Sequence, residues 1–191
     1  MRRRCALLRG GCPVCLEIPG YPRVVLRGRR PSDRQAWLAA RRRNPRHFDG
    51  TGDSATAWWR ELRRGYGGLR SPGGLVLVLD VDGVYAGETR LADLDMFDRN
   101  ARMSGWADPA YADGGVRAAT TRALLEYAFD TLGLLRVSTE IDSADTESAA
   151  VAARAGLLKE GTMRNCPGPA GRRTDRALWA LTVGPPKEKR T

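Results

Sequence analysis

The order of secondary-structure signals changes at Gly114-Gly115, and this change constrains the fold more than any other feature of the sequence. Before it, Asp82-Gly83 separates two strand-like runs, and a third run ends at Asp108-Pro109. Asp-Gly between apolar runs is a strong hairpin signal. After it, a long helical pattern over 116–132 precedes a strand, a helix and two further strands. Antiparallel hairpins followed by β-α-β crossovers predict a mixed sheet with helices on both faces.

Apolar periodicity and turn residues place the remaining elements. The first helix should end near Asn44, because the residue before a proline avoids the helical ψ. We expect about seven strands in a mostly antiparallel sheet, an α/β (α+β) class. The expected helices begin near residue 31 and cover 55–66, 116–132 and 146–155, and the expected strands cover 23–27, 75–80, 84–94, 101–107, 136–141, 157–163 and 176–183.

The length of 191 residues favours one domain. Hydrophobic residues make up 42% of the chain and charged residues 28%, which is typical of globular proteins. Residues 1–20 show no hydrophobic period, so we expect a disordered N-terminal extension there. The domain should then span 21–183, and 184–191 should form a C-terminal tail.

The cysteine count and the apolar runs indicate a cytoplasmic protein. Four cysteines are too few for a disulfide scaffold at this length. Cys12 and Cys15 have the spacing of metal ligands, but no second pair is near, so we expect no metal site. The longest aliphatic run, 75–79, is far shorter than the ~20 residues of a membrane-spanning helix, so we expect no membrane insertion.

The formal net charge of +10 comes from 32 Lys and Arg against 22 Asp and Glu. These basic residues occur along the whole chain, whereas a nucleic-acid site predicts clustering on one face. We therefore expect no specific nucleic-acid partner, and the charge favours anionic small molecules and acidic partners. Arg41-Arg42-Arg43 is interpreted as a solvated helix end, with attraction of an acidic acceptor as the alternative.

The sequence over 101–165 resembles the acyl-CoA core of the GNAT N-acetyltransferases, and within them the branch that includes the RimJ/RimL ribosomal-protein acetyltransferases. The motifs that carry the resemblance occur in the family's order, and together they cover roughly residues 21 to 183. They are LRGRRPSD (26–33), DGVYAGETRL (82–91), GWADP (105–109), RALLEYAFDTLGLLRV (122–137), and Ser148 to Gly156 followed by Leu157 and Glu160-Gly161.

The resemblance implies a GNAT fold and an acetyl-CoA-dependent N-acetyltransferase. Such an enzyme transfers an acetyl group to a primary amine by direct attack in a ternary complex. The acceptor, a protein N-terminus or a small molecule, stays open, and an antibiotic- or polyamine-modifying enzyme is the rival within this class. A homodimer is one assembly that the sequence leaves open.

The turn at Gly114-Gly115 suits an anionic ligand on physical grounds as well. A strand that enters a glycine-rich turn and then a helix presents backbone N–H groups at the positive end of the helix dipole. Gly115 has no Cβ, so a phosphate could approach its backbone closely. By resemblance, the residues that contact acetyl-CoA are Met103, Trp106, Ala107, Gly114, Gly115, Val116, Arg117, Ala118 and Asp145.

Several positions depart from the family's pattern. The family's turn reads Q/R-x-x-G-x-G/A, and here Ala112, Asp113 and Arg117 differ from it, while Asp145 replaces a family Asn. Asp113 brings a carboxylate beside the expected phosphate site, which is repulsive unless it caps the helix. These changes keep open a second function, a degenerate GNAT domain that binds a ligand or partner without turnover.

Acetyl transfer needs a neutral amine, a donor for the oxyanion and a proton for the thiolate. By resemblance, Ser148 protonates the thiolate and Glu160 accepts the amine's proton, and Glu88 is a second candidate base. The structural alternatives are a helix-start role for Ser148 and an exposed strand position for Glu160. His47, the single histidine, lies outside the core motifs, so we expect no catalytic histidine.

Overall fold

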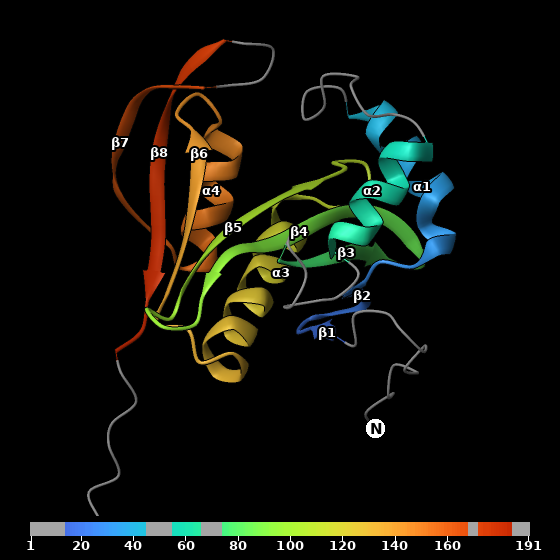
Figure 1. The fold of residues 1–191 in the computed structure, drawn as a ribbon, viewed down its shortest axis with the longest axis horizontal. Helices are drawn as coiled ribbons and strands as arrows, with labels where there is room; N and C mark the ends of the chain where they lie inside the picture. Colours follow the sequence, from blue (N-terminus) through green and yellow to red (C-terminus); the bar gives the residue numbers. More distant parts are fainter. Residues whose placement is uncertain (1–13, 45–54, 66–73, 168–171, 185–191) are drawn as a thin grey trace, which may run out of the picture.

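An open sheet of eight strands runs through the part of the chain that the computed structural model describes, residues 14–44, 55–65, 74–167 and 172–184 (Figure 1). The spatial strand order is β1-β2-β3-β4-β5-β6-β8-β7. The strands are β1 (Cys15–Ile18), β2 (Tyr21–Gly28), β3 (Leu75–Val81), β4 (Val84–Asp95), β5 (Asn100–Ala107), β6 (Arg136–Asp142), β7 (Leu158–Pro167) and β8 (Arg173–Thr182). The helices are the short η1 (Pro31–Asp33), α1 (Arg34–Arg43), α2 (Ala55–Gly65), α3 (Gly114–Glu126), the π-helical turn η3 (Tyr127–Thr131) and α4 (Thr146–Ala155).

The expected sheet is confirmed: all strand pairs are antiparallel except β5 with β6. That parallel pair is short, since it joins only 100–102 of β5 to 136–138 of β6. Beyond these residues the two strands diverge, as Figure 1 shows. These three pairs are therefore the only hydrogen-bonded link between β5 and β6 among the described residues.

The helices form two layers, one on each face of the sheet. α3 and α4 pack against each other and cover one face, where the larger core cluster includes Leu77, Leu79 and Leu124. α1 and α2 cover the other face, where Trp37 and Trp58 pack with residues of β3 and β4. β3 is the strand that both layers cover, and its residues 75–80 are all buried. This explains its continuous apolar run, because a strand that is buried on both faces does not alternate.

A buried ion-pair cluster fixes the start of α1 to the sheet. The Arg27 guanidinium donates to both carboxylate oxygens of Asp33 at 2.9 Å, and its Nε donates to Asp80 at 2.7 Å. All three residues are buried. Because each charge has a partner, the cluster sets the orientation of α1 without leaving an unpaired buried charge.

The expectation of a disordered extension over residues 1–20 is wrong for its last part. Cys15–Ile18 forms β1, which pairs antiparallel with β2 and brings the strand number to eight instead of about seven. Ile18 is only 3% exposed, so β1 contributes to the core. A positive φ of 81° at Gly20 allows the tight turn between the strands. Residues 1–13 and 185–191 lie outside the described residues.

The other expected elements occur close to their predicted bounds. The turn between β3 and β4 has positive φ at both Asp82 (53°) and Gly83 (83°), as the Asp-Gly pair predicts for a type I′ hairpin. α3 begins two residues earlier than expected, at Gly114, and its last turn is π-helical. No described helix is both long and apolar enough to span a bilayer.

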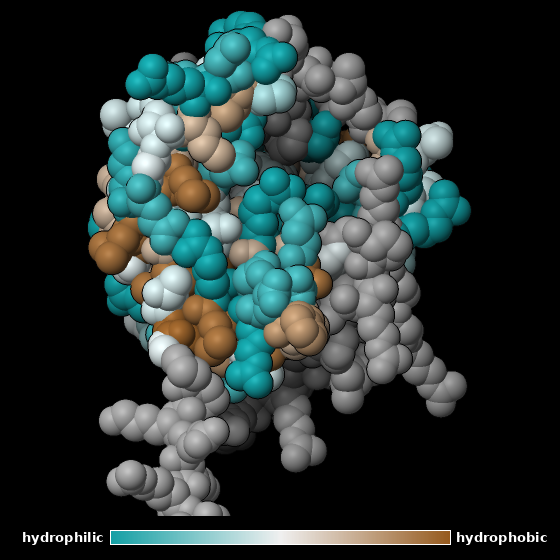
Figure 2. All heavy atoms as spheres, turned by 60° about the vertical axis from the view of Figure 1, so that its left-hand side comes forward, coloured by the Kyte–Doolittle hydropathy of each residue, from teal (hydrophilic) through white to brown (hydrophobic). Residues whose placement is uncertain are grey.

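The side of the molecule that carries β7 and β8 has no continuous hydrophobic surface in Figure 2. Hydrophobic residues there stand among hydrophilic ones. Singly exposed apolar side chains are ordinary on protein surfaces, so this face does not by itself indicate a partner.

Candidate active site

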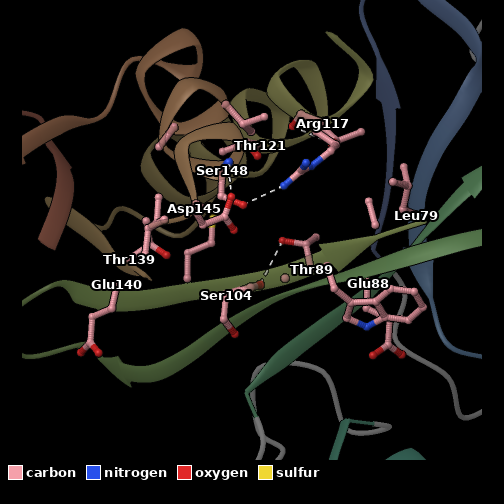
Figure 3. Close-up of a pocket in the computed structure, with 18 of the residues that line it drawn as sticks. Leu79, Glu88, Thr89, Ser104, Arg117, Thr121, Thr139, Glu140, Asp145 and Ser148 are labelled. Atoms are coloured by element: carbon pink, nitrogen blue, oxygen red, sulfur yellow. Dashed lines mark hydrogen bonds between the residues drawn. The ribbon is translucent and has the colours of Figure 1, made fainter. Parts of the chain in front are cut away.

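A cavity of about 250 Å³ lies where β5 and β6 diverge, on the side covered by α3 and α4 (Figure 3). Both diverging strand ends line it, together with side chains from the two helices. Six of the residues expected from the sequence line this cavity: Met103, Trp106, Ala107, Arg117, Asp145 and Ser148.

The four other expected ligand-binding residues form the first turns of α3 and do not line the cavity itself. Asp113 caps this helix, and its carboxylate accepts hydrogen bonds from the backbone N–H groups of Gly115 (2.8 Å) and Val116 (2.9 Å). The acidic side chain is therefore compatible with the helix dipole. The four residues are Gly114, Gly115, Val116 and Ala118, of which the last two are buried.

Two side chains from other elements approach the start of α3. A Cβ at Gly115 would lie only 2.9 Å from the Tyr21 hydroxyl oxygen, and a Cβ at Gly114 would lie 3.5 Å from Nη1 of Arg154. Arg154 belongs to the last turn of α4. The helix start thus combines close packing that favours glycine with a nearby cation that the sequence interpretation did not include.

Arg117 points from α3 toward the first turn of α4 (Figure 3). Its Nη1 donates to Glu147 at 2.6 Å, and its Nη2 donates to the Ser148 hydroxyl oxygen at 3.0 Å. The carboxylate of Asp145 caps α4 by accepting the Ser148 backbone N–H at 2.9 Å. Asp145 is thus the cap of α4, and the Ser148 side chain is not needed for that role. The Ser148 hydroxyl accepts a hydrogen bond from Arg117 and can still donate its own proton.

Glu88 reaches the same cavity from the opposite face of the sheet. It pairs across the sheet with Val78 and Trp106, which pack with the α1–α2 cluster. Figure 3 shows Glu88 on the other side of the strands from Arg117 and Ser148. The divergence of β5 and β6 is what lets one cavity contact residues of both layers.

The surroundings of Glu88 orient its carboxylate. The Tyr85 hydroxyl and the Arg29 Nε both donate to the same oxygen, Oε1. Burial, together with the Glu88 charge, raises the pKa of Tyr85 well above its ordinary value, so this phenol stays protonated and donates. Burial alone would lower the pKa of Arg29, but the Glu88 carboxylate outweighs it and raises that pKa. With Oε1 so engaged, Oε2 is the oxygen that can accept a further proton.

Glu160 does not join this constellation. It lies on β7 and does not line the cavity, and its carboxylate forms an exposed ion pair with Arg136, with Nη1 2.8 Å from Oε1. The hydrogen bond from Arg136 lowers the pKa of Glu160. Glu88 lines the cavity and Glu160 does not, so position favours Glu88 as the base at this site.

The sequence contained weak signals for the residues that it did not single out. Arg29 is one of four arginines in the run 27–34, and no local pattern distinguishes it from its neighbours. Tyr85 lies three positions before Glu88 in the same hairpin motif, so the hairpin is the sequence feature that could have indicated Tyr85 as a partner of Glu88. Among the described residues, no three His, Cys, Asp or Glu side chains gather as metal ligands.

Comparison with known proteins agrees with this geometry. The chain matches the family described as "Acetyltransferase (GNAT) domain" over residues 23–158. It is 33% identical over 105 residues to a Bacillus subtilis (strain 168) protein named "Putative ribosomal N-acetyltransferase YdaF". That match covers 55% of this chain and 56% of the relative, so the chain spans about half the length of the curated relative it matches.

Two solved structures share the fold across nearly the whole chain. Mycobacterium smegmatis RimJ in complex with CoA-disulfide superimposes with a TM-score of 0.75 at 25% identity, covering 89% of this chain and 86% of that one. A RimL described as a ribosomal L7/L12 alpha-N-protein acetyltransferase in complex with coenzyme A gives 0.72 at 18% identity, covering 89% and 98%. The fold, the divergent strands and the family match over 23–158 agree, and the chain belongs to the GNAT acetyltransferase domain family.

Proposed function

We propose that this protein is an N-acetyltransferase that transfers an acetyl group from acetyl-CoA to a primary amine. The observation that carries the proposal is the cavity between β5 and β6, which brings Ser148 and Arg117 from one layer and Glu88 from the other to one space. Acyl transfer from a thioester to an amine needs a proton acceptor for the amine and a proton donor for the sulfur. In this proposal Glu88 is the proton acceptor on one side of the cavity, and Ser148 is the proton donor on the other.

The residues at the start of α3 suit the phosphates of coenzyme A. The helix dipole and the nearby Arg154 guanidinium favour an anion there. The Asp113 carboxylate holds two of the backbone N–H groups, so a phosphate would share or replace that cap. When bound, acetyl-CoA supplies the activated acyl group as a thioester.

Glu88 acts as the general base in this proposal. Its Oε2 accepts the proton of the incoming ammonium or of a water between them, while Arg29 and Tyr85 hold Oε1 in place. A base that is oriented by two donors is already positioned before the substrate arrives.

Ser148 acts as the proton donor. Arg117 donates to its oxygen, so the hydroxyl proton is free to turn toward the cavity. A hydrogen bond from a cation also polarises the hydroxyl and makes it a better donor. Arg117 departs from the family's turn pattern, but in this proposal it orients and polarises the Ser148 hydroxyl.

The acceptor in this proposal is a protein amino terminus. The names of YdaF and of the RimL structure, a ribosomal N-acetyltransferase and an alpha-N-protein acetyltransferase, support this choice.

Thiol release is the direct test. The purified protein is incubated with acetyl-CoA and a panel of peptides, small amines and polyamines, and the coenzyme A thiol is titrated against time. We expect release that depends on an amine acceptor, with the acetylated product identified by mass spectrometry. Calorimetric binding of coenzyme A without acceptor-dependent release would contradict turnover and support a binding domain instead.

A further inference from the structure

We infer that the edge of the molecule where β4 turns into β5 is an interface between two copies of this chain. A cavity of about 490 Å³ lies at this edge. It shares no lining residue with the cavity that contains Ser148 and Glu88. The inference is therefore independent of the proposed function, and it commits to one partner, a second copy of the chain.

Three segments that are far apart in the sequence form this cavity. They are the turn between β4 and β5, the π-helical turn η3 with its connection to β6, and the end of β8. Figure 1 shows the β4–β5 turn and the end of β8 at the same edge of the molecule. The cavity is thus a feature of the folded chain and not of any one loop.

The lining of this cavity is mainly apolar. Six of its ten residues have an apolar side chain: Met96, Phe129, Leu132, Leu134, Leu135 and Val183. Beside Met96, the side chain of Phe97 is 95% exposed. An aromatic ring that projects into water next to an apolar depression is the combination that interfaces bury.

Backbone hydrogen bonds hold the three segments together. The Arg99 carbonyl accepts the N–H groups of Leu135 (2.6 Å) and Arg136 (3.2 Å), and the Leu135 carbonyl accepts the Val183 N–H at 3.0 Å. These bonds link the β4–β5 turn to the start of β6, and the start of β6 to the end of β8. The walls of the cavity are therefore fixed before a partner arrives, which lowers the entropic cost of binding.

The turn that presents Phe97 is equally well defined. One carboxylate oxygen of Asp95 accepts the backbone N–H groups of Phe97 and Asp98, each at 2.9 Å. Arg99 then adopts a positive φ of 54°, a conformation that non-glycine residues rarely take and that its carbonyl contacts stabilise here. The Phe97 backbone is thus held in place although its side chain contacts water.

Two opposite charges in the lining indicate a second copy as the partner. Arg99 and Asp130 both line the cavity and are both exposed. Within the described ranges, neither side chain forms an ion pair or a hydrogen bond. A surface with one unpaired charge of each sign is complementary to itself, whereas a single sign would require a different protein.

Two-fold symmetry pairs these charges. In such an interface, residue i of one copy contacts residue j of the other, and j contacts i. An axis that passes between the two side chains brings Arg99 of each copy opposite Asp130 of the partner subunit. In this arrangement Phe97 covers the apolar lining of the partner's cavity, and both surfaces are removed from water.

Sedimentation velocity of the full chain, from low to high micromolar concentration, tests the interface. We expect the mass to rise from 20.9 kDa toward twice that value. Phe97→Asp should weaken the dimer by roughly thirtyfold or more, because aromatic interface residues contribute most and each substitution acts twice. Val84→Asp is the control, since Val84 is 37% exposed at the other end of β4, and it should change the dissociation constant by about threefold at most.

Reversing the two charges tests the pairing itself. Arg99→Glu and Asp130→Arg should each weaken the dimer by roughly tenfold, because each places like charges opposite one another. The double variant keeps the pair in reversed order, so its dissociation constant should return to within about threefold of the original. Thermal unfolding checks that every variant is folded.

Three results would overturn the inference. A monomer at every concentration would mean that the C-terminal segment or a different protein covers the cavity. A dimer that is unchanged by Phe97→Asp has its contact elsewhere on the surface. A double reversal that remains as weak as the single ones would show that Arg99 and Asp130 do not pair across the interface. Since the measured quantity is a mass, none of these results depends on acetyl transfer.

Discussion

Two cavities meet at Glu88, and they differ in the charge of their linings. Among the described residues, five charged side chains line the cavity on the α3–α4 side: four are acidic, those of Glu88, Glu140, Asp142 and Asp145, and one is basic, that of Arg117. Five charged side chains also line the cavity on the α1–α2 side, but three of them are basic, those of Arg29, Arg41 and Arg90, against Glu61 and Glu88. Both cavities are assembled from strands and helices that lie far apart in the sequence, so the difference between them is one of charge.

Replacing the shared carboxylate should have the largest effect, because both cavities depend on it. Glu88→Gln keeps the size of the side chain but removes the proton acceptor, so kcat should fall by about 10²–10⁴-fold. Glu160→Gln is the matched control, since that residue is exposed and lies outside both cavities. Steady-state thiol release measures both variants. A large loss for Glu160→Gln with little for Glu88→Gln would reverse the assignment.

Closing the start of α3 should act on the cofactor side alone. In Gly115→Val, the Cβ would already press on the Tyr21 hydroxyl, and its two methyl groups would occupy the approach to the backbone N–H groups. We expect the affinity for coenzyme A to fall by roughly tenfold to a hundredfold, which corresponds to about 1.4–2.8 kcal/mol.

Gly161→Val, where a Cβ meets nothing within 4 Å, controls for the added β-branched side chain. Calorimetry gives the affinity, and thermal unfolding checks that both variants fold. Unchanged coenzyme A affinity in folded Gly115→Val would place the phosphates elsewhere.

Removing the proposed proton donor should have a smaller effect confined to turnover. Ser148→Ala should lower kcat by roughly tenfold or more with little change in KM, because the proton is needed only in the transition state. Ser143→Ala removes an exposed serine hydroxyl just before α4, outside the cavity, and should leave kcat near its original value. If Ser148→Ala raises KM while kcat holds, the hydroxyl binds the substrate and does not donate a proton.

Features that depend on neighbouring residues could be predicted from the sequence. Local patterns predicted the Asp82-Gly83 turn, a helix from 116 that in the structure begins at Gly114, and the α4 helix over 146–155, but they did not predict the Asp145 cap of α4. Strand β1 did not follow from its four residues, because its stability comes from pairing with β2 and from the burial of Ile18.

The choice between Glu88 and Glu160 was equally invisible in the sequence. Each is a single carboxylate on a strand. The difference lies in partners that the fold supplies: Arg29, 59 positions away, orients Glu88 inside the sheet, whereas Arg136 holds Glu160 at the surface. The one partner of Glu88 that lies near it in the sequence is Tyr85, three positions earlier in the same hairpin.

The smallest expected effect concerns Asp108, which joins the two sides of the molecule. Its carboxylate is nearly buried and accepts from Arg43 Nε at the end of α1 (2.9 Å) and from the Ala110 N–H in the connection to α3 (3.1 Å). Burial alone would raise the pKa of Asp108, but these hydrogen bonds and one from Asn44 outweigh it and lower the pKa.

A carboxyl whose pKa is lower in the folded state stabilises the fold above its unfolded pKa of about 3.9, and this contribution is lost as the pH falls through the folded pKa. Asp108→Asn should therefore reduce the free energy of unfolding by about 1–2 kcal/mol at pH 7, and the difference should narrow below about pH 4. Urea unfolding at several pH values measures it, with Asp82→Asn in the exposed pair with Arg23 as a control expected to cost less than about 0.5 kcal/mol. A constant difference at every pH would mean that the Asp108 charge does not stabilise the contact between the two layers.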